Sequence, residues 1–238
     1  MKAFLLAGGR GTRLQPVTLS RPKCLVSIDG VPLLAIWLEL LERNGVTDVL
    51  LNISHHVDQV ESFLNDRAAG PRVRLVVESM PVGNAGTVAS NRAFVADVDD
   101  FWILYSDNLT SLQMAPMIHF HGRHPGLLTM GLFSAPDPSA AGVVSIGDNG
   151  RVLAFEEKPK HPQSQLANAG IYLARHALLD CIPTGRPVVD FGLHVFPSLL
   201  GRIYGHVIDD FLMDVGTPAA LQRAQELWRA RERSELIA

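Results

Sequence analysis

The chain has 238 residues, 47% of them hydrophobic, so it can bury a sizeable core. Its formal net charge of −3 gives no overall basic field, which argues against a nucleic acid partner. No apolar run approaches the roughly 20 residues that a membrane helix needs, and Met1-Lys2 leads directly into the first apolar run without room for a signal peptide. We therefore expect a soluble, cytoplasmic protein that does not bind membranes and keeps Cys24 and Cys181 as buried, reduced thiols.

A glycine-rich loop follows the first apolar run, residues 3–6, which predicts a buried strand. Three glycines at 8–11 remove side chains that would keep a ligand away, and successive N–H groups in such a turn form an anion site. Three cations stand in or near the loop: Arg10, Arg13 and Lys23. The segment lacks the Gly-Lys-Ser/Thr of a Walker A loop and the glycine spacing of a dinucleotide fingerprint. It nevertheless indicates a phosphate site.

Strand and helix patterns alternate through the first half of the chain. Apolar runs predict strands at 49–53, 72–78 and 101–105, and helical spacing predicts helices at 32–44, 57–64 and 87–94. A second glycine-rich loop at 81–86 precedes the last of these helices. Such alternation is typical of an α/β protein with a mostly parallel, mixed central sheet covered by helices on both faces, a three-layer α/β/α arrangement.

The second half of the chain adds hairpins to this pattern. Its expected elements are a helix at 114–121, strands at 127–133, 143–146, 151–155, 171–173 and 203–207, a helix near 192–200 and an amphipathic closing helix at 219–236. Asn149-Gly150 is a strong hairpin signal between two of these strands. Since no linker, repeat or hexapeptide β-helix pattern appears, we predict one domain over residues 1–238.

Residues 8–16 read Gly-Gly-Arg-Gly-Thr-Arg-Leu-Gln-Pro, and Pro22-Lys23 follows. This sequence resembles the signature of the sugar-1-phosphate nucleotidylyltransferases, or NDP-sugar pyrophosphorylases, in their short single-domain form. The resemblance implies a Rossmann-like nucleotidyltransferase fold with a nucleotide-binding half at 1–112, a sugar-phosphate-binding half at 113–218 and a C-terminal helix at 219–238. In that family the loop holds the triphosphate of an NTP, the arginine (here Arg13) grips the departing pyrophosphate and the lysine (here Lys23) contacts phosphate oxygens.

Two aspartates are candidates for a metal site. Asp107 follows the strand at 101–105, where open α/β sheets place their ligands, and Asp214 ends another strand among apolar neighbours that argue against a purely solvated carboxylate. Taken singly, each would more readily cap a turn. Because both match the family's metal aspartates and accompany a phosphate loop, we expect them to hold Mg²⁺, which prefers oxygen ligands.

The sugar-binding residues rest on resemblance. Glu157 and Lys158 match the family's Glu-Lys-Pro motif, in which the glutamate accepts hydrogen bonds from sugar hydroxyls and the lysine binds the sugar phosphate. The alternative is a solvated strand end, the commonest place for such charges. Asn168 and Gly170 match the family's Asn-x-Gly-x-Tyr segment, whose amide reads sugar hydroxyls. The expected substrate-binding set is Gly142, Glu157, Lys158, Asn168, Gly170 and Asp190.

The resemblance also implies a nucleotide-binding set and a catalytic set. The residues expected to contact the NTP are Leu6, Ala7, Gly8, Gly9, Gly11, Thr12, Arg13, Lys23, Glu78, Gly83, Asn84, Gly86, Thr87, Ser106 and Asp107. The residues expected to carry catalysis are Arg13, Lys23, Asp107, Lys158 and Asp214. The expected partners are an NTP and a sugar 1-phosphate, and the assembly considered is a homodimer.

The implied reaction transfers a nucleoside monophosphate to the sugar 1-phosphate and releases pyrophosphate. A sugar-phosphate oxygen, already anionic, would attack the α-phosphorus in line without a general base. Positioning and electrostatics would therefore supply the catalysis. Lys158 would hold the incoming phosphate, Mg²⁺ on Asp107 and Asp214 would bridge to the α-phosphate, and Arg13 would steady the leaving group. Lys23 could serve either phosphate.

The identity of the base is predicted from one side chain, and the identity of the sugar from the resemblance. Glu78 offers an acceptor-only carboxylate that could accept from the N–H and amino groups which guanine presents side by side. We therefore expect GTP, with mannose- or heptose-1-phosphate by resemblance to short guanylyltransferases. The alternative nucleotides are UTP, dTTP and CTP. Glu78 could also cap the strand end without touching the base, which would leave base selection to the backbone.

Other functional classes are weighed on the same residues. A transferase for phosphocholine would need an aromatic cage for its quaternary ammonium, which Asn168 and Glu157 do not suggest. A non-catalytic nucleotide-sensing subunit would be expected to lose an aspartate, Arg13 or Lys158, yet this chain keeps them all.

Two groups of histidines lack the spacing of a transition-metal site. They are His55-His56 and His119, His121 and His124. We expect both groups to be surface or helix-capping residues.

Overall fold

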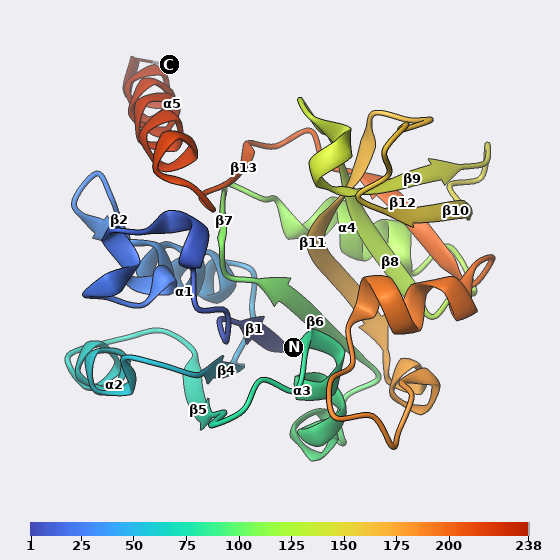
Figure 1. Ribbon diagram of the computed structural model, residues 1–238, viewed down its shortest axis with the longest axis horizontal. Coiled ribbons are helices and arrows are strands. Elements are labelled where there is room, and N and C mark those ends of the chain that lie inside the picture. The colour runs from blue at the N-terminus through green and yellow to red at the C-terminus, as the bar shows by residue number, and fades with distance from the viewer. Residues whose placement is uncertain (238) are drawn as a thin grey trace. The chain divides into compact units, whose positions relative to one another are not determined.

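The computed structural model describes residues 1–237, with side chains described through Arg231. The chain forms two compact units, each assembled from separate segments (Figure 1). The first unit comprises Met1–Phe4, Met80–Leu104 and Gln113–Asp210, and the second comprises Leu5–Ser79, Tyr105–Leu112 and the chain from Phe211 onward. Strands β1 (Lys2–Leu6) and β6 (Asp100–Tyr105) each contribute residues to both units.

The second unit contains the glycine-rich loop and the strands around it. The end of β1 is followed in the strand order by β4 (Asp48–Ile53) and β5 (Arg72–Val77), which run parallel. The remaining elements are the hairpin β2 (Ser27–Ile28)–β3 (Val31–Pro32), the antiparallel pair β7 (Asn108–Thr110)–β13 (Leu212–Asp214), and the helices α1 (Leu33–Arg43), α2 (Val57–Asn65) and α5 (Pro218–Ile237). Helix α1 buries Leu33, Leu34, Trp37, Leu38 and Leu41, as the apolar spacing of the segment predicts.

The first unit is built around one long strand, β11 (Leu166–Arg175). It pairs antiparallel with β6, β8 (Leu128–Ser134) and β9 (Gly142–Ile146), and the strand order runs β10-β9-β11-β6-β1. Strand β10 (Val152–Glu157) forms the predicted hairpin with β9, and β12 (Ile203–Val207) runs parallel to β8. The helices are α3 (Asn84–Ser90) and α4 (Met114–His121). The predicted α/β class, with a mixed sheet flanked by helices, is confirmed.

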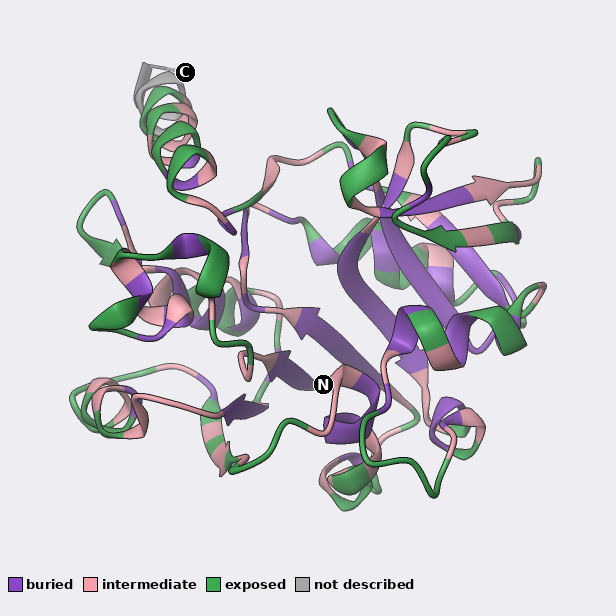
Figure 2. Ribbon diagram, in the orientation of Figure 1, coloured by how far each residue is buried: buried purple, intermediate pink, exposed green. Residues whose placement is uncertain are grey.

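The central strands are buried because their residues are apolar on both faces. Phe101, Trp102, Ile103 and Leu104 of β6 are inaccessible to solvent, and β8 and β11 are buried along most of their length (Figure 2). Strand β4 is equally buried from Val49 to Ile53, and this stretch carries one polar residue, Asn52. A buried amide needs hydrogen-bond partners, so Asn52 points to a special local role.

Three predicted elements differ from the structure. The helix expected near 192–200 is a π-helix at Phe191–Val195 followed by a 3-10 turn at Phe196–Leu199, because Pro197 has no N–H to continue a helix. Strand β11 extends well beyond the predicted 171–173. Its pairing with β8 is irregular between Asn168 and Tyr172, where Gly170 adopts a positive φ of 67°. Helix α3 begins at Asn84, earlier than expected, and gives way to a 3-10 turn at Arg92–Val95.

The prediction for the second histidine group is wrong for two of its members. His121 and His124 are buried, and both rings lie within hydrogen-bond distance of the Thr129 hydroxyl, at 2.7 and 2.8 Å. The His124 ring also stacks on Tyr204. A hydroxyl on β8 therefore turns two histidines of the α4 region inward. His119 is exposed, as expected.

The cysteines are both free thiols. Cys24 is buried, and burial raises the pKa of its thiol to about 12. Cys181 is only half-buried, contrary to the prediction of two buried thiols.

Among the described residues, no helix is both long enough and apolar enough to cross a membrane.

Candidate active site

The glycine-rich loop joins β1 to a 3-10 turn at Thr12–Leu14 in the second unit. A Cβ at position 8 would lie 2.6 Å from Nδ2 of Asn52, and one at position 11 would lie 2.9 Å from Cγ2 of Thr18, so neither site accepts a side chain without displacement. Gly11 also has φ of 63°, in the left-handed region that favours glycine. A Cβ at Gly9 would meet nothing within 4 Å. The loop is therefore packed against neighbouring side chains at Gly8 and Gly11, whereas Gly9 has free space beside it.

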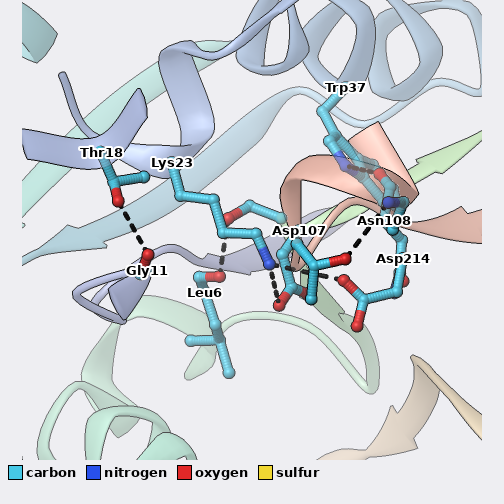
Figure 3. A network of polar contacts seen from close by, with 11 residues as sticks. Leu6, Gly11, Thr18, Lys23, Trp37, Asp107, Asn108 and Asp214 are labelled. Atoms are coloured by element: carbon cyan, nitrogen blue, oxygen red, sulfur yellow. Dashed lines mark hydrogen bonds and ion pairs between the residues drawn. The ribbon is translucent and has the colours of Figure 1, made fainter. Parts of the chain in front are cut away.

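Lys23 lies against this loop and joins two carboxylates. A Cβ at Gly11 would be 3.4 Å from the Lys23 Cβ. The Lys23 ammonium lies 2.9 Å from Oδ2 of Asp107 and 3.5 Å from Oδ1 of Asp214 (Figure 3). The Lys23 side chain is 13% exposed, whereas those of Asp107 and Asp214 are 38% and 54% exposed. The structure therefore brings together three of the predicted catalytic residues.

Backbone pairing fixes both aspartates. Asp214 pairs with Asn108 across β13 and β7, and the Val215 N–H donates to the Asp107 carbonyl at 3.0 Å. The indole N–H of Trp37 donates to the Asn108 carbonyl at 2.8 Å, which anchors β7 to helix α1 (Figure 3). Gly216 leaves room for the Asp214 carboxylate, since a Cβ there would lie 2.7 Å from Oδ1.

The donors around Lys23 fit a hard divalent cation. Two carboxylates already converge on one positive charge, and Mg²⁺ characteristically uses one or two carboxylates with substrate and water oxygens completing its shell. No group of three or more His, Cys, Asp or Glu side chains within the described part of the chain could hold a metal ion. The arrangement suits a cation that arrives with further oxygen ligands.

The other residues predicted to contact the nucleotide in this unit differ in burial and in hydrogen bonding. Oε2 of Glu78 would lie 3.4 Å from a Cβ at Gly8, so this carboxylate is close to the loop. Ser106 is buried and donates its hydroxyl to the Leu6 carbonyl at 2.9 Å, which ties the end of β6 to the end of β1. Thr12 and Arg13 are exposed at the start of the 3-10 turn. Ser106 therefore connects two strand ends, while Thr12 and Arg13 face solvent.

In the first unit, a second cluster forms around Glu157. Oε2 of Glu157 would lie 3.0 Å from a Cβ at Gly142 and equally far from one at Gly192, so two glycines make room for this carboxylate. Burial raises the pKa of Glu157; Lys158 lowers it and Asp190 raises it further. The Lys158 ammonium lies 3.8 Å from Oε1 of Glu157. An acid with a raised pKa beside a lysine is a candidate functional group.

The loop at 82–86 packs against the segment that carries Asp190. Nδ2 of Asn84 donates to Oδ2 of Asp190 at 2.7 Å, and Oδ1 of Asn84 accepts from the Phe191 N–H. The other Asp190 oxygen caps the π-helix by accepting from Gly192 and Leu193. Asp190 therefore has a structural role whatever it contacts in a complex.

The glycines of this loop allow close backbone packing. A Cβ at Gly83 would lie 2.3 Å from the Val189 carbonyl oxygen, and Ala85 and Gly86 both donate to that oxygen. Thr87 donates its hydroxyl to the Gly83 carbonyl at 3.2 Å. These packing contacts account for glycine at positions 83 and 86 without invoking a ligand.

Asn168 is held on β11 by local hydrogen bonds. Its Nδ2 donates to the Tyr172 hydroxyl at 2.6 Å, and its Oδ1 accepts from the Gly170 N–H at 3.0 Å. Tyr172 in turn packs on Phe191 and Phe196. Asn168 is half-buried, so its amide is oriented by these bonds rather than free to turn.

Sequence reasoning missed several residues of both clusters. Asn52, Ser54 and Thr18 hydrogen-bond the glycine loop, and Gly192 borders Glu157. Only Asn52 carried a signal, as a polar residue inside an otherwise apolar buried strand.

The family model described as nucleotidyl transferase matches residues 2–231 of the chain. Mannose-1-phosphate guanylyltransferase of Mycobacterium tuberculosis is 35% identical over 221 residues, covering 91% of this chain and 61% of the relative. The catalytic subunit beta of that enzyme in Dictyostelium discoideum is 32% identical over 223 residues, covering 92% and 62%. The chain thus spans about three fifths of the length of the curated relatives it matches.

Solved structures agree with this assignment. A Bacillus anthracis protein assigned provisionally as a glucose-1-phosphate thymidylyltransferase, in complex with sucrose, gives a TM-score of 0.85 at 27% identity, covering 95% of this chain and 94% of that one. HddC from Yersinia pseudotuberculosis complexed with GMP-PN gives a TM-score of 0.79 at 25% identity, covering 95% and 99%. The sequence signature, the fold and the family match agree: the chain belongs to the nucleotidyl transferase family.

Proposed function

We propose that the chain transfers a nucleoside monophosphate from an NTP to a sugar 1-phosphate, giving an NDP-sugar and pyrophosphate. The observation that carries the proposal is the convergence of Asp107 and Asp214 on Lys23, which packs against Gly11 of the glycine-rich loop. Cations and open N–H groups suit a polyphosphate, while paired carboxylates suit the metal that usually accompanies it. The names of the relatives support the same reaction class.

The reaction requires that the two substrates be positioned correctly, and it does not require a general base. An oxygen of the sugar phosphate is already anionic at neutral pH and can attack the α-phosphorus, forming a new P–O bond as the bond to pyrophosphate breaks. The electron pair of the broken bond leaves with pyrophosphate. Arg13 would bind the departing pyrophosphate, and Lys158 would bind the incoming phosphate. Lys23 would move from the carboxylates to a phosphate oxygen of either substrate.

Mg²⁺ is part of the proposal. Asp107 and Asp214 would hold it, because their oxygens already converge on one cation. When bound, a divalent cation neutralises phosphate charge and orients the phosphate oxygens for displacement. The Lys23 ammonium adds a positive charge beside the two carboxylates, which limits their mutual repulsion.

The sugar would be read by the cluster around Glu157. A carboxylate between Gly142 and Gly192 can accept hydrogen bonds from hydroxyl groups, and neighbouring Lys158 supplies a cation for the sugar phosphate. Asn168 presents an amide whose orientation Tyr172 fixes. A preoriented acceptor set discriminates among sugars better than a mobile one.

GTP with mannose- or heptose-1-phosphate is the substrate pair we propose. Glu78 lies near Gly8, so its carboxylate stands close to the loop expected to hold the phosphates. The guanylyltransferase relatives favour this base, whereas the structural neighbour assigned as a thymidylyltransferase favours dTTP. UTP, dTTP and CTP therefore remain the alternatives to be tested.

A substrate panel tests this proposal. The purified protein would be incubated with Mg²⁺, each of GTP, UTP, dTTP, CTP and ATP, and each of mannose-, heptose- and glucose-1-phosphate, with released pyrophosphate measured. We expect GTP with mannose- or heptose-1-phosphate to react fastest. A preference for dTTP or UTP with glucose-1-phosphate would overturn the substrate choice and keep the reaction class. Nucleotide binding without turnover for every pair would favour a regulatory role.

Assembly and location complete the proposal. A homodimer and a cytoplasmic location are proposed from the sequence and the family. Light scattering on the purified protein, read as a mass of one or two chains of 25.9 kDa, tests the assembly.

A further inference from the structure

Three polar side chains hydrogen-bond the glycine-rich loop within the second unit, and the reaction chemistry uses none of them. Oδ1 of Asn52 accepts from the Ala7 N–H at 2.8 Å. The Ser54 hydroxyl donates to the Gly8 carbonyl at 2.7 Å, and the Thr18 hydroxyl donates to the Gly11 carbonyl at 2.8 Å. Asn52 and Thr18 are only 4% and 5% exposed, so both side chains bond to the loop from the protein interior.

These bonds fix the direction of two peptide groups. A trans peptide group is planar, so its C=O and N–H point to opposite sides. With the Gly8 carbonyl held by Ser54, the N–H of Gly9 must point away from the end of β4. With the Gly11 carbonyl held by Thr18, and also by the Leu14 N–H at 2.9 Å, the N–H of Thr12 points away from Thr18.

The two N–H groups that result have room for a ligand. Gly9 and Thr12 are exposed, and no residue in the described part of the chain accepts a hydrogen bond from either N–H. A Cβ at Gly9 would meet nothing within 4 Å. Unbonded, outward N–H groups in a turn are anion-binding groups.

We propose that Asn52, Ser54 and Thr18 are positioning residues for triphosphate binding. They orient the loop so that the N–H groups of Gly9 and Thr12 face the phosphate oxygens, without contacting the nucleotide themselves. Asn52 fixes the entry to the loop at Ala7, and the two hydroxyls set the peptide planes that follow. This inference rests on the proposed function, because it assigns the loop a triphosphate ligand.

The test uses inorganic tripolyphosphate, which probes the loop independently of the base. Its binding to the purified protein would be measured by calorimetry for wild type, Ser54→Ala and Thr18→Val. We expect Ser54→Ala to bind roughly tenfold more weakly, since Ser54 is the side chain that holds the Gly8 carbonyl. Thr18→Val should weaken binding less, because the Leu14 N–H still holds the Gly11 carbonyl.

Two further variants separate positioning from general damage. Thr18→Ser keeps the hydroxyl and should restore the affinity lost in Thr18→Val. Ser198→Ala removes a comparable hydroxyl-to-carbonyl bond, from Ser198 to Val195 at 2.8 Å, away from the loop and should bind as wild type does. In turnover assays, Ser54→Ala should raise KM for the NTP and leave KM for the sugar phosphate unchanged.

The outcomes distinguish the inference from the proposed function. If wild type binds tripolyphosphate and Ser54→Ala binds it equally well, the positioning role is wrong and the proposed function stands. If wild type does not bind tripolyphosphate, the loop is not a phosphate site and the proposed function loses its basis. If Ser198→Ala weakens binding as much as Ser54→Ala, the effect is not specific to the loop, which contradicts the inference.

Discussion

The two units hold their charged side chains in different ways. In the second unit, Lys23, Asp107 and Asp214 form ion pairs at partly exposed strand ends, and the nearby loop offers backbone N–H groups. In the first unit, Asn84 and Asp190 bond to each other and to the backbone, and burial raises the pKa of Glu157. The first arrangement suits a polyphosphate with a metal, whereas the second offers hydrogen-bond acceptors for hydroxyl groups, with the Lys158 ammonium 3.8 Å from Glu157 to pair with a single phosphate.

The largest effect is expected where the ion pairs of the second unit are removed. Asp107→Ala and Asp214→Ala should each lower turnover by roughly 10²-fold or more, the scale of losing one preorganised electrostatic element. Released pyrophosphate measures turnover, and circular dichroism checks that the fold is kept. EDTA should abolish activity in wild type, and added Mg²⁺ should restore it. Full activity in either variant at wild-type Mg²⁺ affinity would remove the proposed metal site.

The next prediction separates the two units by substrate. Arg13→Ala should raise KM for the NTP, and Lys158→Ala should raise KM for the sugar phosphate, each by roughly tenfold, as expected for a lost charge-assisted hydrogen bond. Steady-state kinetics with each substrate varied in turn gives both constants. Our division of roles would be wrong if both variants raised only KM for the NTP.

A site can be predicted from the sequence when the residues that form it are neighbours in the chain. The glycine-rich loop lies in one short segment with its own cations, so the sequence alone predicts a phosphate site there. Asp107 and Asp214 follow recognisable strands, but their convergence on Lys23 depends on the pairing of β7 with β13, whose partners are about 100 positions apart in the sequence. No local pattern predicts such pairing.

The same reasoning explains the residues that sequence analysis missed. Ser54 and Thr18 are ordinary polar residues until the fold brings their hydroxyls to the Gly8 and Gly11 carbonyls. The buried His121 and His124 depend on Thr129 of the neighbouring strand. In each case the hydrogen-bond partner lies in a different element or loop of the fold, and the local propensity of the segment carries no information about it.

Acid should destabilise the first unit through this histidine pair. Nδ1 of His124 accepts from the Gly126 N–H at 3.1 Å, so the folded protein needs the neutral ring. Burial, with the charges of His121 and Arg175, lowers the pKa of His124 to about 4, while an unfolded histidine titrates near 6.5. The unfolded state therefore binds more protons between these values, and stability present above pH of about 6.5 is lost as the pH falls towards about 4.

The size of this effect is measurable. At pH of about 5.5, His124 should reduce the free energy of unfolding by about 1 kcal/mol relative to pH of about 7.5. Urea unfolding at both pH values would measure it. His124→Gln should flatten the dependence, whereas His119→Gln, an exposed histidine on α4, should keep the wild-type dependence. An unchanged pH dependence in His124→Gln would contradict the assignment.

The smallest expected effect concerns the base. Glu78→Gln keeps the size of the side chain and removes its charge, so it should reduce the preference for GTP over dTTP by roughly threefold without changing KM for the sugar phosphate. Competition between the two nucleotides in one reaction measures that preference directly. An unaltered preference would mean that Glu78 does not read the base.

The fate of the α-phosphorus tests the central claim most directly. The protein would be supplied with GTP carrying ³²P at the α-position, mannose-1-phosphate and Mg²⁺, and the products separated by chromatography. We predict that the label appears in a sugar nucleotide, with one unlabelled pyrophosphate released for each labelled product and none formed without the sugar phosphate. Label appearing as GMP or GDP in amounts independent of mannose-1-phosphate would identify a hydrolase and contradict the account.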